Sequence, residues 1–184
     1  MDHHAARTGC WSGLNHANVE AWRGLYAQFG GMVQRLARGM VGAGDADDVT
    51  QETFLQAFRK SKQFRGQCAR EFETWLYRIA INKCRDWRRK RQCRPVLVGV
   101  PDLAQVGGGA PCLEDRLDDI DLLQVGLQGV TPDLRALLLL HMAGRSYREI
   151  GVILKIKSKG TVSERLGLAR EQLRQSLLRL GWSE

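Results

Sequence analysis

The sequence contains few of the residues that interrupt helices or cross-link a chain. Four prolines occur in 184 residues, and three of them lie between positions 95 and 111. The five cysteines include no C-x-x-C pair and are odd in number, so their spacing supports neither a zinc ribbon nor a complete disulfide framework. We therefore expect reduced thiols and no bound metal.

Long apolar runs are also missing. No segment approaches the ~18 consecutive apolar residues that can cross a bilayer. The start Met1-Asp2-His3-His4 lacks the basic and then apolar layout of an export signal. The sequence therefore predicts a cytoplasmic protein with no membrane insertion of its own.

β-strand patterns are equally scarce. Strict alternation of apolar and polar residues is rare, whereas apolar residues recur three and four positions apart over most of the chain. This spacing predicts an all-α fold, with helices over about 71–92 and from Asp45 to about Ser61, and a break or kink at Gly30-Gly31 in an earlier helix. The apolar face of that earlier helix consists of Trp22, Leu25, Phe29, Val33, Leu36 and Met40.

Positive charge prevails in the chain as a whole. The 28 Lys and Arg residues exceed the 20 Asp and Glu residues, giving a formal net charge of +8 and a pI near 9.6, which favours a polyanionic partner such as nucleic acid. Residues 96–130 differ, because they hold six acidic and one basic side chain together with the triplet Gly107-Gly108-Gly109, a composition typical of a tether. We predict two small helical domains, 15–95 and 131–184, joined by a flexible acidic linker over 96–130.

The second predicted domain has the start signals of three helices. Thr131-Pro132-Asp133 combines a cap with a proline in the first turn. Ser146 with Glu149, and Thr161 with Glu164, have the spacing of a capping box. A short helix, a tight turn and a longer helix in this order predict a helix-turn-helix.

The helix from Asp45 has a mixed face opposite its apolar residues. A leucine surrounded by carboxylates and an amide is typical of a protein-docking surface, and an ordinary solvated face is the alternative. The residues of this face are Asp48, Gln51, Glu52, Leu55 and Arg59.

The helix over 71–92 has a row of cations beside its apolar side, and aromatic groups lie next to this row. Such a surface can follow a phosphate backbone and hold unstacked bases. The alternative is that the charges only aid solubility. The predicted residues are Phe64, Arg65, Tyr77, Arg78, Asn82, Arg85, Arg88 and Arg89.

The helix-turn-helix predicts a second nucleic-acid surface, because the start of a recognition helix usually reaches base edges in the major groove. Lysines crowd the preceding turn, and small side chains permit close approach. A helical hairpin used for dimerisation is the alternative. The predicted residues are Arg148, Lys157, Lys159, Thr161, Val162, Ser163, Arg165 and Arg170.

Catalytic patterns are weak. Asp45, Asp47, Asp48 and Glu52 supply enough carboxylates for a magnesium-dependent nuclease, but Asp45 is accounted for as a helix cap and the others point in different directions. No constellation with a nucleophile is recognisable around His141. The sequence therefore predicts no enzymatic activity, no catalytic residue and no cofactor.

In three stretches the sequence resembles a known family, the bacterial RNA polymerase sigma factors of the extracytoplasmic-function (ECF) group, which belongs to the sigma-70 family. The stretches are DADDVTQETFLQAF at 45–58, FETWLYRIAINKCRDWRR at 72–89, and SYREI at 146–150 followed by GTV at 160–162. The resemblance covers nearly all of residues 19–181. It implies a sigma region 2-like bundle and a region 4-like helix-turn-helix.

The resemblance also implies partners for the three surfaces. The docking face would bind the beta-prime clamp helices of core RNA polymerase, and the second domain would meet the beta flap. The helix over 71–92 would read the minus-ten promoter element and the last helix the minus-thirty-five element. An anti-sigma factor and a stress, envelope or metal regulon would follow from family habit. The acidic linker would face the polymerase active-site path through Glu114, Asp115, Asp118, Asp119 and Asp121.

Two departures from the family pattern affect the helix-turn-helix. The family turn commonly reads G-I-P-V-G-T-V, whereas this chain has KIKSKGTV at 155–162, which is one residue longer and more basic. Ser163 replaces a common basic residue, so promoter preference does not transfer. A stand-alone helix-turn-helix regulator that never engages polymerase is the alternative function.

Overall fold

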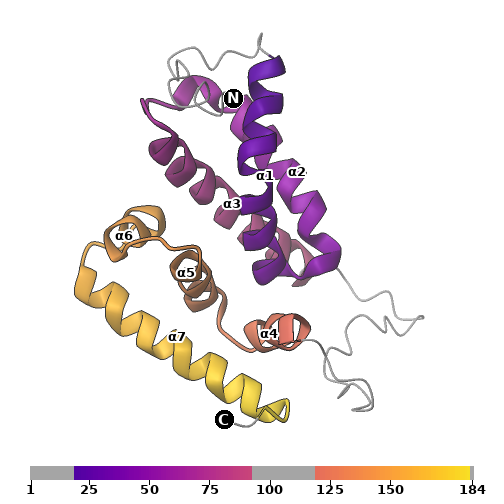
Figure 1. Cartoon of the computed structure of the whole chain (residues 1–184), viewed down its shortest axis with the longest axis vertical. Helices are drawn as coiled ribbons and strands as arrows, with labels where there is room; N and C mark the ends of the chain where they lie inside the picture. Colours follow the sequence, from indigo (N-terminus) through magenta and orange to yellow (C-terminus); the bar gives the residue numbers. More distant parts are fainter. Residues whose placement is uncertain (1–18, 93–118, 183–184) are drawn as a thin grey trace, which may run out of the picture.

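The computed structural model describes residues 19–92 and 119–182, and within these ranges every regular element is helical (Figure 1). The all-α prediction is therefore confirmed. In chain order the elements are α1 (Val19–Val41), α2 (Ala43–Arg59), the 3-10 turn η3 (Ser61–Gln63), α3 (Ala69–Gln92), α4 (Asp119–Gln128), α5 (Pro132–Met142), α6 (Tyr147–Leu154) and α7 (Lys159–Arg179).

The first bundle consists of α1, α2 and α3, which pack against one another. All six residues of the predicted apolar face of α1 are buried, because their spacing puts them on the side that meets α2 and α3. The helix continues through Gly30 and Gly31, so the break expected there is absent. The core also contains Phe54 of α2 and Phe72 of α3.

One predicted helix cap in this bundle is wrong. Helix α2 begins two residues before Asp45, with Gly42 at the N-cap in a left-handed conformation (φ 97°). Asp45 lies in the first turn instead, where its carboxylate pairs with Arg91 of α3 at 2.5 Å. A negative charge in the first turn still complements the helix dipole, so the residue favours the helix without capping it.

The second bundle consists of α4 to α7 and contains the predicted helix-turn-helix in α6 and α7. The capping box of Ser146 and Glu149 is confirmed, and Lys155 ends α6 in a left-handed conformation (φ 58°). The capping box predicted at Thr161 is wrong, because α7 begins at Lys159 and its N-cap is Ser158, whose hydroxyl accepts from the amide of Gly160. Part of the lengthened basic turn thus becomes helix.

Helix α4 forms within the segment predicted to be a linker, so residues 119–128 are a correction to that prediction. Leu127 is buried, and a methyl group at Gly126 would lie 2.5 Å from Leu177 of α7. This close approach shows why α4 belongs to the second bundle. The acidic residues Glu114, Asp115 and Asp118 lie outside the described residues.

The two bundles pack against each other, with α4 and α5 on α1 and α6 on α3 (Figure 1). A methyl group at Gly39 of α1 would lie 2.5 Å from Leu139 of α5, so small size at Gly39 permits the contact. Buried apolar residues of both bundles form one continuous cluster. The boundaries of the two predicted domains stay a prediction, but the bundles are in direct contact.

Arg135 of α5 lies at the centre of this contact with its side chain fully buried. Its guanidinium donates to the backbone carbonyls of Met40 in α1 (3.0 Å), Gln128 in α4 (2.7 Å) and Val130 (2.8 Å). Burial, with a smaller contribution from Arg88, lowers the pKa of Arg135 to about 10. The group therefore remains protonated at neutral pH, and the negative ends of α1 and α4 stabilise it.

Replacing this arginine tests its structural role. Arg135→Ala should lower the free energy of unfolding by about 3 kcal/mol, because two buried carbonyls and one partly buried carbonyl lose their donor. Urea denaturation followed by circular dichroism measures the change. Arg23→Ala removes an exposed arginine whose pair lies within α1, and it should change stability by less than about 0.5 kcal/mol. Equal effects of the two substitutions would contradict this role.

Candidate polymerase and nucleic-acid surfaces

The mixed face of α2 lies on the solvent side of the first bundle. Asp48, Gln51 and Arg59 are exposed, and Leu55 retains 54% of its surface. Glu52 is partly covered, because its carboxylate accepts a hydrogen bond from Lys83 of α3 at 2.9 Å, which lowers the carboxyl pKa. The face thus combines one exposed leucine with polar groups that α3 partly holds in place.

An aromatic residue that the sequence patterns did not indicate is exposed beside α2. Tyr26 of α1 is 47% exposed, and its ring lies 4.8 Å from that of Phe54 in α2. It lies four positions after Trp22 and three before Phe29, at the edge of the apolar stripe of α1, so its exposure cannot be recognised from helical periodicity alone.

The cationic row of α3 runs toward the second bundle, and its arginines have protein partners. Arg78 donates through Nη2 to the carbonyl of Val152 in α6 at 2.7 Å. Arg85 pairs with Asp133 of α5 at 2.8 Å. Their guanidinium groups therefore contact the second bundle while they remain partly exposed to solvent.

The other predicted residues of this row have more varied surroundings. Arg89 pairs with Asp86 within α3, and Arg88 donates to the carbonyl of Met40. Asn82 is exposed. Two of the arginines thus have their partners within the first bundle.

Tyr77 does not have the exposed position that the sequence analysis gave it. The side chain is 2% exposed, and this burial raises the pKa of its hydroxyl. The guanidinium carbon of Arg145 lies 5.7 Å from the centre of its ring. Because α3 is covered on one side by α1 and α2 and on another by α6, a residue beside the first apolar stripe becomes buried as well.

In the loop before α3, one aromatic residue is partly buried against the first bundle and one arginine is exposed to solvent. The ring of Phe64 packs against Phe72 at 5.5 Å and Trp75 at 5.2 Å. Arg65 is exposed. The loop therefore presents cationic charge next to a ring that is half-buried.

The start of α7 matches the predicted duplex surface except at one residue. Arg148, Lys157, Lys159, Ser163 and Arg165 are exposed, and Thr161 is half-buried. Val162 is fully buried in the core, so its predicted direct contact with DNA is wrong. The side chain at this position packs α7 against α6, and it supports the surface from beneath.

Two arginines of the predicted duplex surface, Arg165 and Arg170, lie close to other protein groups. The Nη2 atom of Arg170 lies 3.0 Å from Nε2 of His141 in α5. Arg165 lines a small cavity of about 310 Å³ that also contains Arg85 and Asp133. The predicted surfaces of α3 and α7 therefore meet at this cavity.

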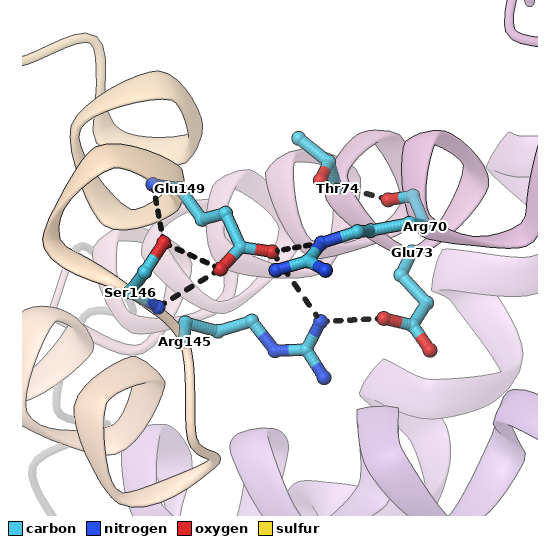
Figure 2. Close-up of polar contacts among 6 residues, drawn as sticks. All are labelled: Arg70, Glu73, Thr74, Arg145, Ser146 and Glu149. Carbon is cyan, nitrogen blue, oxygen red and sulfur yellow. Dashed lines mark hydrogen bonds and ion pairs between the residues drawn. The ribbon is translucent and has the colours of Figure 1, made fainter.

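A polar cluster that the sequence analysis did not predict joins α3 to the start of α6 (Figure 2). Arg70 donates to Glu149 at 2.7 Å, and Arg145 donates to Glu73 at 2.5 Å. Glu149 also accepts from the hydroxyl and the amide of Ser146. The capping carboxylate of α6 is therefore also an ion-pair partner of the first bundle.

The surroundings of Glu149 favour its charged form. The hydrogen bond from Arg70 is the largest cause, the bonds from Ser146 add to it, and burial opposes them, so that the carboxyl pKa falls to about 2. A folded-state pKa below the ordinary value stabilises the fold at pH values above about 4.5, and this stabilisation is lost as the pH falls toward 2.

Acid titration tests this pKa. Glu149→Gln should lower the free energy of unfolding at pH 7, and its difference from the wild type should shrink as the pH falls from about 4.5 to 2. Urea denaturation at a series of pH values measures the difference. Glu164→Gln alters an exposed carboxylate of α7 and should differ little from the wild type throughout. A Glu149→Gln difference that does not change with pH would contradict the lowered pKa.

A cleft of about 830 Å³ lies between α1 and the second bundle. Its lining is mainly apolar and also includes charged side chains. The apolar part includes Phe29, Met32, Leu36, Leu123, Leu127, Leu139 and Met142, and the charged part includes Arg35, Arg38, Glu73 and Arg145.

Neither a metal site nor a membrane span is found in the part of the chain that the structure describes. No three His, Cys, Asp or Glu residues of that part gather in a way that could hold a metal ion, and none of its helices is long and apolar enough to cross a membrane. Of the two cysteines described, Cys68 is exposed and Cys84 is buried. Burial raises the pKa of the Cys84 thiol to about 12, which makes it unreactive.

Comparison with known proteins places both bundles in one family. The family model for sigma-70 region 2 matches residues 25–94, which include α2 and α3. An ECF RNA polymerase sigma-E factor of Escherichia coli is 32% identical over 171 residues, covering 87% of this chain and 88% of that protein. The chain belongs to the ECF sigma factors. The family recognised from the three sequence stretches is thereby confirmed.

Other relatives agree with this assignment. The ECF sigma factor SigE of Mycolicibacterium smegmatis is 36% identical over 169 residues, which are 89% of this chain but 64% of that protein. The solved structure of the sigma factor RpoE in complex with the anti-sigma factor NepR from Bartonella quintana shares the fold, with a TM-score of 0.63, 21% identity and coverage of 86% and 98% of the two chains. CnrH in complex with the cytosolic domain of CnrY has a TM-score of 0.56, 25% identity and coverage of 91% and 94%.

The family decides between the two functions that the sequence left open. An ECF sigma factor directs transcription and is a regulatory protein rather than an enzyme. The stand-alone regulator is not favoured, because the similarity extends over α1 to α3 as well as the helix-turn-helix. The residues that this sigma factor uses for each partner remain predictions.

Proposed function

We propose that this ECF sigma factor binds core RNA polymerase in the cytoplasm through α2 and guides it to promoters through α3 and α7. The observation that carries the proposal is the similarity to a sigma-E factor over 87% of the chain. We assign each contact to side chains on the surfaces of these helices. The protein acts by binding alone, and it needs no cofactor for this role.

The α2 face is suited to a protein partner. Leu55 is 54% exposed, and polar side chains surround it. Burial of such an apolar residue inside a polar rim is the usual anatomy of a protein interface. We assign the contact with the beta-prime clamp helices to Asp48, Gln51, Glu52, Leu55 and Arg59, and a contact with the beta flap to the second bundle.

The start of α7 is suited to duplex DNA. Ser163 and Arg165 are exposed in its first two turns, where side chains of a recognition helix reach base edges. Lys157 and Lys159 lie beside them and are exposed as well, so they can contact phosphates on entry to the groove. We assign the minus-thirty-five element to this surface, with Thr161, Arg148 and Arg170 at its edges and Val162 beneath it.

The α3 surface is assigned to the minus-ten element. Asn82 and Arg89 are exposed on the helix and Arg65 on the preceding loop. Arg78, Arg85 and Arg88 would add phosphate contacts once free of their present partners, and the half-buried ring of Phe64 could stack on a base after a small movement. Tyr77 supports the helix from inside.

An anti-sigma factor is a further proposed partner. Two solved structures of similar fold are complexes with such inhibitors. The cleft against α1 is lined by apolar side chains together with arginines, which suits an amphipathic helix with acidic flanks. We propose this cleft as the place where such a segment binds.

A substitution in the α2 face tests the polymerase contact. Leu55→Asp should weaken binding to core RNA polymerase at least tenfold, because it places a charge where an apolar side chain is buried. Fluorescence anisotropy of labelled protein titrated with core measures the affinity. Val19→Asp alters another exposed apolar residue, at the start of α1, and should leave binding unchanged. An unaltered affinity of Leu55→Asp would remove Leu55 from the interface.

Substitutions at the start of α7 test the duplex contact. Lys157→Ala and Lys159→Ala should each weaken binding to promoter duplex and lower the slope of log affinity against log salt by about 1. Filter binding over a range of salt concentrations measures both quantities. Arg179→Ala removes a cation at the other end of α7 and should change neither. A wild-type slope in both lysine variants would show that these two lysines do not contact phosphates.

Reconstituted transcription tests the function as a whole. Added protein should yield promoter-specific transcripts with core RNA polymerase on genomic fragments. If it bound duplex DNA without joining core, the stand-alone regulator would be correct.

A further inference from the structure

The outward face of α7 carries a carboxylate and a leucine in the second and third turns of the helix. Val162, Leu166 and Ala169 are buried against the second bundle. At about 100° per residue, Glu164 and Leu168 lie on the side of the helix away from these three. Glu164 is exposed, and Leu168 retains 55% of its surface. Both side chains therefore point away from the bundle, one helical turn apart.

The Glu164 carboxylate has no partner in the described part of the chain, because no hydrogen bond or ion pair there involves it. Its neighbours on α7 differ in this respect. Glu171 accepts from Arg174 and Gln175, and Arg165 lines the small cavity that contains Asp133. The carboxylate of Glu164 is therefore free to accept a hydrogen bond from a partner molecule.

Two glycines share the outward face with Glu164 and Leu168. Gly160 and Gly167 are exposed, and a methyl group at Gly167 would meet nothing within 4 Å. Packing within the protein thus gives no reason for a glycine at Gly167, and glycine in a helix interior is less favourable than alanine. A missing side chain does permit another molecule to come close to the backbone. In the major groove it lets the helix lie nearer to the base edges.

The chemistry of the two side chains matches two particular base edges. In the major groove a glutamate accepts from the N4 amino group of cytosine, and an apolar side chain contacts the C5-methyl group of thymine. Guanine presents the acceptors O6 and N7 there, which repel a carboxylate. A negative side chain at this place therefore selects for cytosine and against guanine.

We propose that Glu164 and Leu168 set the base preference of the minus-thirty-five surface, Glu164 by accepting from a cytosine amino group and Leu168 by contacting a thymine methyl group. The inference rests on the proposed function of α7. Residues four apart are separated by about 6 Å along a helix, and stacked bases by about 3.4 Å. The two bases therefore lie within about two base pairs of each other. The exposed Lys157 and Lys159 offset the repulsion between the carboxylate and the phosphates.

The variant Glu164→Gln tests the cytosine contact. The reference duplex is a promoter that the wild type transcribes with core RNA polymerase, and competition binding compares it with duplexes in which each base pair upstream is changed in turn. The full-length protein bound to core should prefer cytosine to guanine about 5- to 150-fold at one position. Glu164→Gln should lose this preference there and keep the others. The matched control Glu171→Gln makes the same charge change on the same helix and should keep all of them.

The variant Leu168→Ala tests the thymine contact. Deoxyuridine in place of thymine removes the C5-methyl group and leaves the base pair otherwise unchanged. At one position within about two base pairs of the cytosine, this replacement should weaken wild-type binding about 4-fold. Leu168→Ala should bind both duplexes equally. The matched control Leu178→Ala alters another exposed leucine, near the end of α7, and should respond as the wild type does.

The variant Gly167→Gln tests the close approach of α7 to the bases. It should fold with at least the thermal stability of the wild type, because the new side chain meets open space and glutamine favours a helix more than glycine does. Its affinity for the promoter duplex should fall by at least about 5-fold, the loss of one base contact. Thermal unfolding and the same competition assay measure the two quantities.

Three results would overturn the inference while the proposed function stands. A variant that keeps every wild-type base preference removes its residue from base recognition. Equal weakening on all sequences would indicate a general effect of charge or folding. Unchanged base preference with fewer transcripts would indicate that this face binds a protein instead. Failure of the proposed function has a different signature, since Lys157→Ala, Lys159→Ala and Gly167→Gln would then all bind promoter duplex as the wild type does.

Discussion

The arrangement of the two bundles depends on one buried cation. Arg135 has no carboxylate partner among the described residues, and it donates to carbonyls at the ends of α1 and α4 and to Val130. Burial of a charge without a counter-ion is unfavourable unless its donors are satisfied. The carboxyl ends of two helices meet this requirement, because their free carbonyls carry partial negative charge. The guanidinium thereby joins α1 of the first bundle to α4 and α5 of the second.

Around Arg135 the contact between the bundles combines buried apolar packing with weaker, partly exposed ion pairs. Gly39 packs closely on Leu139, and Tyr77 is buried. These are short-range van der Waals contacts. The pairs of Arg70, Arg85 and Arg145 with carboxylates across the contact are partly exposed, and water and salt weaken such pairs. The contact therefore combines buried apolar packing at its centre with partly exposed ion pairs.

Some side chains serve both local structure and the contact between the bundles. Glu149 completes the capping box of α6 and also accepts from Arg70 of α3. Arg85 of α3 pairs with Asp133 of α5 across the same contact.

The sequence by itself determined the features that depend on neighbours along the chain. Helical periodicity identified the buried face of α1 and the exposed face of α2, the spacing of Ser146 and Glu149 identified a helix start, and three short stretches identified the family. Features that depend on distant residues were decided only by the tertiary structure. Tyr77 and Val162 became buried because another helix covers them, residues 119–128 became helical because α7 and α1 offer them an apolar surface, and the arginines of α3 found partners 48 to 79 positions away. Periodicity reports one covered face of a helix, whereas a second covered face and a long-range ion pair arise only when separate elements meet.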